Sequence, residues 1–438
     1  MNRVVITGLG AITPSGQSVE TLWNSVVRGR SAITVLAGDQ FDGLPVRIGG
    51  QIRGFDVSGL MAPALARRLS AVQHWAIAAA DQAMAQAGAA MAQAAAEALP
   101  WDASRVAIIA ATGSGPVDAQ QEATRALDAR GARAVPLALV MHGAPDGAAA
   151  LLSQRYGVRG PAHGVSATCA SGAVGLGEGL RRIRHGYADA VLVVGMEDCL
   201  NPVNLASNAN LRALASGFED APASASRPFD RARSGFVMAQ GAAAILLESE
   251  ASARARGAEV LAVLAGFGES SDAHHPTAPH PAGRGAAEAM RMCLTDAGVD
   301  PGTVDHINAH GTGTPAGDAA EIAALRAVFG DRLGQIALTA SKSSTGHLLG
   351  ASGVVEAIIA VQTVRSGMVP PTINLDDPEF TDIDVVSGVA REGTVRAVLS
   401  NSFGFGGHNG AVLITRASTD EIVSGVASAA LRDPEENP

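Results

Sequence analysis

The stretch His163-Gly164-Val165-Ser166-Ala167-Thr168-Cys169-Ala170-Ser171-Gly172 decides the fold, and it leads directly into a periodic apolar segment. Leu176, Leu180 and Ile183 recur at helical spacing, so the segment predicts an amphipathic helix with Cys169 in its first turn. Free backbone N–H groups and the helix dipole at that position favour the thiolate, which is the nucleophilic form of cysteine. The alternative is a core thiol, because small apolar residues surround this cysteine.

The composition is that of a globular protein with a tightly packed interior. Hydrophobic residues make up 47% of the chain and charged residues 17%, aromatic residues only 3%, and there are 51 glycines. Because 438 residues are many for a single hydrophobic core, we expect two halves. The formal net charge of −10 and the lack of a basic run argue against a nucleic-acid partner.

Cysteine usage and hydropathy indicate the compartment. Cys169, Cys199 and Cys293 are odd in number and far apart, so they predict neither a disulfide framework nor a CxxC metal site. No window reaches the roughly 18 uninterrupted apolar residues of a spanning helix, and the N-terminal apolar run is too short for a signal peptide. We therefore expect a cytoplasmic protein with no membrane partner.

The same order of elements occurs twice along the chain. In the first half we expect strands over 3–7, 106–111, 190–195 and 241–248, and helices over 19–28, 65–88 and after Cys169. In the second half we expect strands over 260–265, 304–309, 397–399 and 411–415. The clearest echo relates 170–186 to 351–367, at a constant offset of 181 positions. Strands buried on both faces, in a repeated order, predict duplicated βα halves in layers of helices and sheets. We place the halves at 1–255 and 256–416, followed by a frayed polar tail at 417–438.

Two histidines of the second half are candidates to serve the cysteine. His310 follows a predicted strand, and His347 precedes the helix that mirrors the Cys169 helix. If the halves are related by pseudo-symmetry, the two helix starts lie close together at the centre, which brings His347 towards Cys169. For a lone histidine a structural role is the commoner one. A zinc site of Cys169, His310 and His347 is a further alternative, although no fourth ligand occurs at the usual spacing.

One cysteine, two neutral histidines and backbone N–H donors suit a condensation of thioesters. The cysteine takes an acyl group, and two N–H donors stabilise the enolate oxygen that forms when a second thioester loses CO₂. The enolate carbon then attacks the acyl-cysteine. Lys342 either tunes this cluster by its positive charge or pairs with Glu356 or Glu321.

These residues resemble the motifs of elongating β-ketoacyl-[acyl carrier protein] synthases, over residues 3–416. The matching motifs are Thr168-Cys169-Ala170-Ser171-Gly172, Asn308-Ala309-His310-Gly311-Thr312-Gly313-Thr314, Lys342-Ser343-Ser344-Thr345-Gly346-His347 and Asn401-Ser402-Phe403-Gly404-Phe405-Gly406-Gly407. The resemblance implies an α/β thiolase fold, with duplicated βαβαβαββ halves in an α-β-α-β-α layered sandwich. It also implies an acyltransferase that condenses a cysteine-bound acyl group with malonyl carrier protein.

The resemblance also implies a role for each matching residue. Cys169 is the acyl-accepting nucleophile, His310 and His347 support decarboxylation and condensation, and Lys342 organises the site. Phe405 is the gate between the two steps, and its backbone N–H completes the oxyanion hole with that of Cys169. The candidate substrate-binding and supporting residues are Thr312 and Thr314 on the pantetheine arm, Phe403, Asn208 and Pro116 at the substrate pocket, and Asp318, Glu321 and Glu356 behind the catalytic residues. No metal or organic cofactor is expected, because phosphopantetheine arrives on the carrier protein.

Departures from the family pattern leave the pathway open. Gln240 stands where the family usually carries an acid, and Ala239 resembles ketosynthase subunits of aromatic and polyene polyketide systems. Asn208 and Pro116 fall at the substrate pocket, and a polar or reshaped pocket suits an unsaturated or oxygenated chain. The alternatives are fatty-acid elongation, a type II polyketide ketosynthase subunit that pairs with a chain-length factor, and a non-catalytic carrier-binding subunit.

The resemblance implies two kinds of protein partner. One is a second ketosynthase-like chain, in a homodimer or a heterodimer. The other is the acidic carrier protein, whose docking on this acidic chain requires a local basic patch. Arg67, Arg68 and Arg212 match the docking positions, and the alternative for each is ordinary solvated surface.

Overall fold

A computed structural model describes residues 2–89 and 99–417, so the predicted tail lies outside the described residues apart from Ala417. Within the described residues, ten strands form one mixed sheet in the order β10-β9-β13-β14-β8-β1-β7-β6-β4-β5. The strands of the first half are β1 (Val4–Ile12), β4 (Val106–Ala111), β5 (Ala162–Val165), β6 (Ala190–Asp198) and β7 (Gln240–Ser249). Those of the second half are β8 (Ala262–Ser271), β9 (His306–Asn308), β10 (Ala337–Thr339), β13 (Ala397–Gly404) and β14 (His408–Thr415).

The sheet order is the same in each half when read outward from the centre. The first half runs β1-β7-β6-β4-β5 and the second half β8-β14-β13-β9-β10. β1 and β8 join the halves through two antiparallel pairs, Val5 with Val263 and Ile6 with Ala262. In the first half β1 pairs antiparallel with β7 and β4 pairs parallel with β5. In the second half β8 pairs antiparallel with β14 and β9 pairs parallel with β10. The predicted duplication is confirmed.

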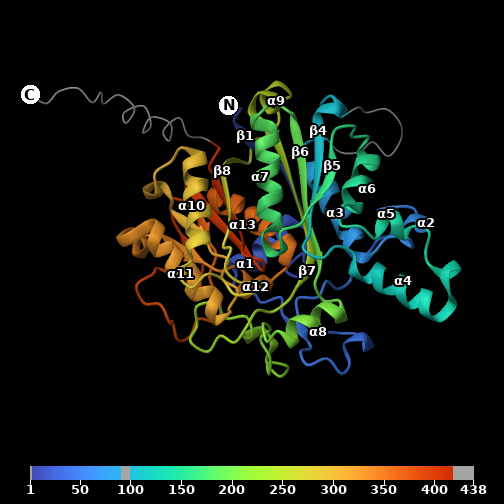
Figure 1. The fold of residues 1–438 in the computed structure, drawn as a ribbon. Coiled ribbons are helices and arrows are strands. Elements are labelled where there is room, and N and C mark those ends of the chain that lie inside the picture. Colours follow the sequence, from blue (N-terminus) through green and yellow to red (C-terminus); the bar gives the residue numbers. More distant parts are fainter. Residues whose placement is uncertain (1, 90–98, 418–438) are drawn as a thin grey trace, which may run out of the picture.

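Helices pack against this sheet in three layers. The main helices are α1 (Val19–Val27), α3 (Ala71–Gln86), α6 (Gly147–Tyr156) and α7 (Ser171–Arg184) in the first half, and α10 (Arg284–Ala297), α11 (Pro315–Phe329) and α13 (Ser352–Ser366) in the second. One hydrophobic core holds α3 and α6 against the first-half strands, and another holds α10 and α11 against the second-half strands. The largest core contains α7, α13 and strands of both halves. Figure 1 shows this order, with α10 and α11 on the left, α7 in the middle, and α3 and α6 on the right.

Shorter elements complete the fold. They are α2 (Pro63–Ala66), α4 (Val117–Arg130), α5 (Leu139–His142), α8 (Pro202–Asn210), α9 (Glu250–Ala255), α12 (Lys342–Thr345), β2 (Thr34–Val35), β3 (Ile48–Gly49), β11 (Met368–Val369) and β12 (Arg391–Glu392). α4 and α5 project from the body as an arm, on the right of Figure 1.

The first helix of the α3 layer differs from the prediction. The sequence predicts one helix over 65–88, whereas the chain forms α2, turns, and restarts at Ala71. The Gln73 side chain holds the new helix start, because its oxygen accepts the backbone N–H of Ser70 at 3.2 Å. This local side-chain bond favours a fresh helix start over continuation through the preceding residues.

Gly172 and Gly353, 181 positions apart, lie where α7 and α13 cross. A Cβ atom on Gly353 would be 2.6 Å from the backbone nitrogen of Ala173, and one on Gly172 would be 2.8 Å from that of Val354. The turns before the two helices share a rare conformation, because Thr168 and Leu349, also 181 apart, have φ of 50° and 42°. The pseudo-symmetry therefore extends to the backbone of the two helix starts.

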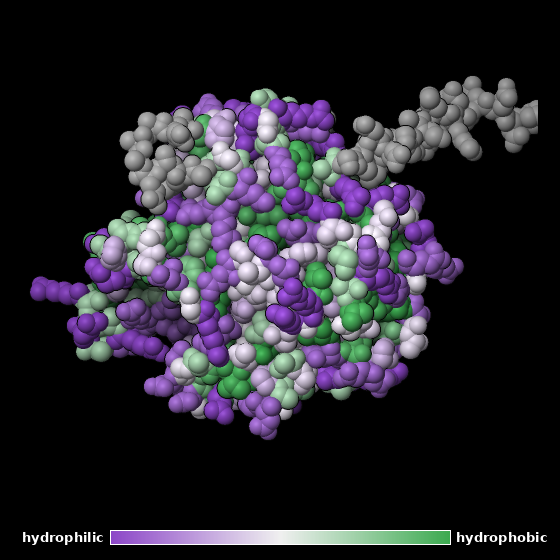
Figure 2. Space-filling model, turned by 180° about the vertical axis from the view of Figure 1, so that it is seen from behind, coloured by the Kyte–Doolittle hydropathy of each residue, from purple (hydrophilic) through white to green (hydrophobic). Residues whose placement is uncertain are grey.

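Seen from behind, the surface carries hydrophilic residues interspersed with small hydrophobic groups, and it is hollowed beside the projecting arm on the left (Figure 2). Among the described residues no helix has the length and apolar character needed to cross a bilayer.

We predict that Gly353→Ala destabilises the protein by about 1–3 kcal/mol, because the added methyl group meets backbone of the crossing helix. Urea unfolding followed by circular dichroism measures the change. Gly393→Ala is the matched control, since its Cβ meets no atom within 4 Å. Equal free energies of unfolding for the two variants would contradict the conclusion that the helices must pack closely at Gly353.

Candidate active site

Cys169 lies in a single turn of 3₁₀-helix, Thr168–Ala170, directly before α7. The turn is held on both sides. The Thr168 hydroxyl donates to the carbonyl of Phe405 at 2.9 Å, and the Ser171 hydroxyl oxygen accepts from the N–H of Ala167 at 2.8 Å. Cys169 is 6% exposed, so its thiol contacts the interior of the site and not open solvent.

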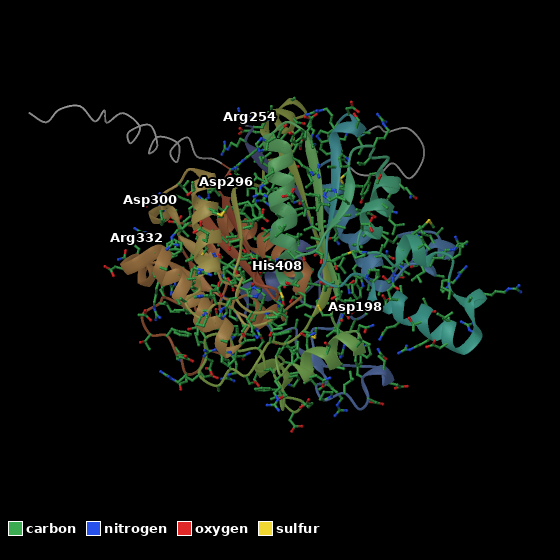
Figure 3. All side chains as sticks on the ribbon, in the orientation of Figure 1. Asp198, Arg254, Asp296, Asp300, Arg332 and His408 are labelled. Carbon is green, nitrogen blue, oxygen red and sulfur yellow. The ribbon has the colours of Figure 1, made fainter. Side chains whose placement is uncertain are left out.

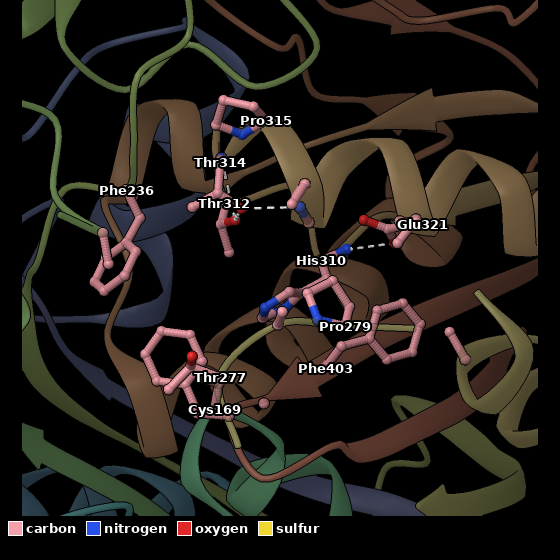
Figure 4. Close-up of a pocket in the computed structure, with 18 of the residues that line it drawn as sticks. Cys169, Phe236, Thr277, Pro279, His310, Thr312, Thr314, Pro315, Glu321 and Phe403 are labelled. Carbon is pink, nitrogen blue, oxygen red and sulfur yellow. Dashed lines mark hydrogen bonds between the residues drawn. The ribbon is translucent and has the colours of Figure 1, made fainter. Parts of the chain in front are cut away.

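One cavity of about 380 Å³ brings the candidate residues of the two halves together. Its lining includes Cys169 from the first half and His310, His347, Phe403, Phe405, Thr312, Thr314 and Glu321 from the second. The rings of His310 and His347 are close to perpendicular, with centroids 5.3 Å apart. In Figure 4 Cys169 lies at one end of the cavity, His310 in the middle, and Thr312 and Thr314 at the other end.

Hydrogen bonds fix the position of each histidine, and one ring nitrogen of each has no hydrogen-bond partner among the described residues. Nδ1 of His347 is 3.0 Å from the hydroxyl oxygen of Ser352, which also accepts the N–H of Leu348. The backbone N–H of His310 donates to Glu321 at 2.8 Å. Among the described residues, Nε2 of His347 and Nδ1 of His310 have no hydrogen-bond partner. Both nitrogens are buried, so their hydrogen-bonding capacity is unused within the described part of the chain.

Burial keeps the reactive side chains neutral. Desolvation first, and then the charge of Lys342, lower the pKa of His310 and of His347 well below the ordinary value. Desolvation also raises the pKa of the Cys169 thiol to about 12, against the opposing effects of Lys342 and of a hydrogen bond from the Phe405 backbone. Burial thus outweighs the thiolate preference that the helix-start position predicts, and the thiol and both imidazoles are neutral near pH 7.

Lys342 forms a buried ion pair with Glu356, one of the two partners that the sequence allowed. The ammonium donates to Oε1 of Glu356, and the two side chains are 1% and 2% exposed. The other candidate, Glu321, instead accepts the N–H groups of His310 and Gly311, each at 2.8 Å. Glu321 therefore holds the His310 loop, and Lys342 provides a fixed positive charge beside the two rings.

The Thr312–Thr314 loop forms the far wall of the cavity. The hydroxyls of Thr312 and Thr314 are 3.1 Å apart, and Thr314 caps α11 by accepting the N–H of Gly317 at 3.2 Å. Asp318 lies behind this loop and accepts the N–H of Gly313 at 3.1 Å. The two hydroxyls are thus presented to the cavity by a rigid helix start.

Several predicted residues lie away from this cavity. Pro116 and Asn208 are not among its lining residues; Pro116 precedes α4, and the Asn208 amide donates to the carbonyl of Asn204 on α8. Arg67 and Arg68 are exposed at the end of α2, whereas Arg212 lines the cavity mouth. The three arginines are therefore divided between the mouth and a separate surface.

Two supporting residues were not predicted. Ser352 contacts His347, and it lies 181 positions after Ser171, which holds the Cys169 turn. The constant offset of the repeat could therefore have predicted its role. Glu197 is fully buried and accepts hydrogen bonds from backbone on both sides of the site. Its sequence context, at the end of an apolar strand, gave no such signal. Within residues 2–89 and 99–417, no group of three or more His, Cys, Asp or Glu side chains is arranged to hold a metal, so the zinc alternative gains no support.

Comparisons with known proteins agree with this geometry. Residues 1–253 match the model of the beta-ketoacyl synthase N-terminal domain, and residues 261–376 match that of the C-terminal domain. A 3-oxoacyl-[acyl-carrier-protein] synthase 2 from Synechocystis is 38% identical over 93% of this chain and 96% of its own length.

Two solved structures share the fold. The ishigamide ketosynthase/chain length factor has a TM-score of 0.85 at 30% identity, covering 95% of this chain and 100% of that chain. A type II polyketide ketosynthase, bound to a hexaketide and solved with its acyl-carrier protein, also has a TM-score of 0.85, at 28% identity and with the same coverage.

The histidine environments predict a specific pH response. Because the pKa values of both rings are lowered, proton uptake begins only well below pH 6.5, so we expect the condensation step to keep its rate from about pH 8 down to about pH 6. Single-turnover measurements that start from enzyme already acylated on Cys169 isolate this step from thiol deprotonation. A loss of rate with an apparent pKa near 6.5 would contradict the neutral pair.

Proposed function

The chain belongs to the β-ketoacyl synthase family of condensing acyltransferases, and we propose that it joins an acyl group on Cys169 to a malonyl group delivered by an acyl carrier protein. The observation that carries this proposal is the shared cavity, which places one thiol and two neutral imidazoles in contact with the same substrate volume.

In the first half-reaction, the Cys169 sulfur attacks the carbonyl carbon of the acyl thioester while a neutral imidazole takes the thiol proton. The backbone N–H groups of Cys169 and Phe405 stabilise the oxyanion of the tetrahedral intermediate. The carrier's sulfur leaves and receives the proton, so the products are acyl-Cys169 and a free carrier thiol.

In the second half-reaction, the carboxylate of the malonyl thioester leaves as CO₂, and its electron pair forms an enolate. The imidazoles of His310 and His347 line the cavity, and as N–H donors they stabilise the enolate oxygen. The enolate carbon attacks acyl-Cys169, and the cysteine leaves as a thiolate that is reprotonated for the next cycle. The chemistry needs no metal or organic cofactor, because the thioester itself supplies the electron sink.

We predict that Cys169→Ala abolishes acylation, whereas His310→Ala and His347→Ala retain some acylation and lose condensation by about 10²-fold or more. Mass spectrometry of the acyl-enzyme and a product assay with malonyl carrier protein measure the two steps separately. Wild-type condensation by either histidine variant would remove that histidine from the mechanism. Failure of the wild-type enzyme to acylate on Cys169 would favour the non-catalytic carrier-binding alternative.

The second candidate function, a polyketide ketosynthase subunit, is favoured by a specific departure from the family pattern. Ala239 stands where fatty-acid enzymes usually have Gly and resembles the ketosynthase subunits of aromatic and polyene polyketide systems, and its neighbour Gln240 replaces the usual acid. Of the compared structures, one is a type II polyketide ketosynthase and the other is a ketosynthase/chain length factor. Turnover of saturated acyl carriers by this chain alone supports fatty-acid elongation. A requirement for a second homologous chain, with polyene or oxygenated acyl carriers preferred, supports the polyketide role.

A second ketosynthase-like chain is the proposed partner in the assembly. The arm of α4 and α5 exposes large apolar side chains, with Leu137 at 93%, Val140 at 86% and Met141 at 63%. Covering these side chains would remove an apolar surface that a monomer leaves in water. Light scattering of the purified chain distinguishes a homodimer from a monomer that requires a different partner.

Arg212 is the proposed docking residue closest to the chemistry, because it lines the cavity mouth. We predict that Arg212→Glu raises the KM for the carrier protein about tenfold and leaves acylation by a small soluble thioester unchanged. Arg254→Glu is the control, since this arginine lies on α9, far from the site (Figure 3). An equal effect of both variants would show that net charge, and not docking at the mouth, sets the KM.

A further inference from the structure

Because the two halves repeat the same fold, each residue near the start of α7 has an equivalent position near the start of α13. Val191 on β6 and Val398 on β13 both face the central core, and they pair with Leu247 and Ile414 on the neighbouring strands. Six residues further along lie Glu197, the last but one residue of β6, and Gly404, the last residue of β13. Both lie at the end of the sheet where α7 begins, which Figure 3 marks by Asp198, next to Glu197, and His408, the strand partner of Gly404.

Gly404 leaves the N–H of Cys169 uncovered. A Cβ atom at this position would be 3.0 Å from the Cys169 nitrogen and 2.2 Å from the Thr168 hydroxyl oxygen. A side chain at position 404 would therefore block the N–H that the proposed oxyanion hole uses.

At the equivalent turn before α13, Leu349–Ala351, the Glu197 side chain covers the backbone N–H that would otherwise be free. The counterpart of Cys169, 181 positions later, is Gly350, and its N–H donates to Oε2 of Glu197 at 3.0 Å. The same carboxylate accepts the N–H of Gly113 at 2.6 Å, the N–H of Ser114 at 3.0 Å and the hydroxyl of Thr112 at 3.1 Å. With four donors and no exposed surface, the carboxylate is bound as an anion would be in an oxyanion hole.

We propose that Glu197 is a positioning residue whose carboxylate permanently occupies the duplicate of the oxyanion hole and thereby fixes both Cys169 and His347. On one side it holds Gly350, three residues after His347. On the other side it holds Gly113, whose Cβ position is 3.4 Å from the carbonyl oxygen of Thr168 and whose carbonyl accepts the Ser166 hydroxyl at 3.4 Å. One buried side chain thus joins the turn of the nucleophile to the segment of the histidine.

The charge of Glu197 reaches the thiol as well. Its negative charge adds to burial in raising the pKa of Cys169, whereas Lys342 acts in the opposite direction. The position of Glu197 therefore predicts two separable effects, one on the charge state of the thiol and one on the alignment of the reacting groups. Only the second depends on the proposed function.

The test of charge is the rate of Cys169 alkylation by iodoacetamide as a function of pH, read by mass spectrometry of the intact protein. Glu197→Gln removes the charge and nearly preserves the shape, so we expect its alkylation profile to move to lower pH, with about threefold to tenfold faster alkylation near pH 8. Glu259→Gln, which removes an exposed carboxylate paired with Arg365, is the control and leaves the profile in place. A Glu197→Gln profile identical to wild type overturns the electrostatic part of the proposal.

The test of alignment uses Glu197→Asp, which keeps the charge but shortens the reach to Gly350. We expect its alkylation profile to match wild type while the single-turnover condensation rate falls about tenfold or more. Thermal unfolding of both variants identifies a folding failure, and the alkylation profile of the folded fraction still reports the charge effect. Wild-type condensation by Glu197→Asp overturns the positioning role. Loss of acylation in the wild-type enzyme would instead overturn the proposed function and leave the alkylation result intact.

Discussion

The structure depends on the close crossing of α7 and α13 at Gly172 and Gly353. Each glycine lies against backbone of the other helix, so no side chain separates the two helix starts. The turns that precede the helices are consequently adjacent, although they are 181 residues apart in the chain. Cys169 belongs to one of these turns and His347 lies just before the other, so the crossing forms the site.

Before the reaction, the reacting groups of the site, the Cys169 thiol and the imidazoles of His310 and His347, are uncharged. Burial lowers the pKa of both histidines and raises that of the cysteine thiol, so each group is neutral near pH 7. Lys342 is the nearby cation, and Glu356 compensates it. Charge therefore develops mainly during the reaction, where fixed N–H donors and a fixed ammonium stabilise it without reorganisation.

Duplication followed by divergence explains why only one of the two turns is suited to chemistry. The counterparts of Cys169 and His347 are Gly350 and Ser166, which lack a strong nucleophile and a base. Gly404 leaves an N–H uncovered in one copy, whereas Glu197 covers it in the other. The second turn has become a structural support that carries an internal anion in the place of a reaction intermediate.

The sequence by itself determined the duplication, most of the strands, and which cysteine and histidines belong to one site. These features depend on local periodicity and on the repeat offset, and both can be read along the chain. Only the tertiary structure decided that Glu356 and not Glu321 pairs with Lys342, that Pro116 and Asn208 lie away from the cavity, and that Ser352 and Glu197 support the reacting groups. Such choices depend on distances between segments that are far apart in the chain. The protonation of Cys169 was decided in the same way, because helix position is a local property whereas desolvation is the sum of everything packed around the thiol.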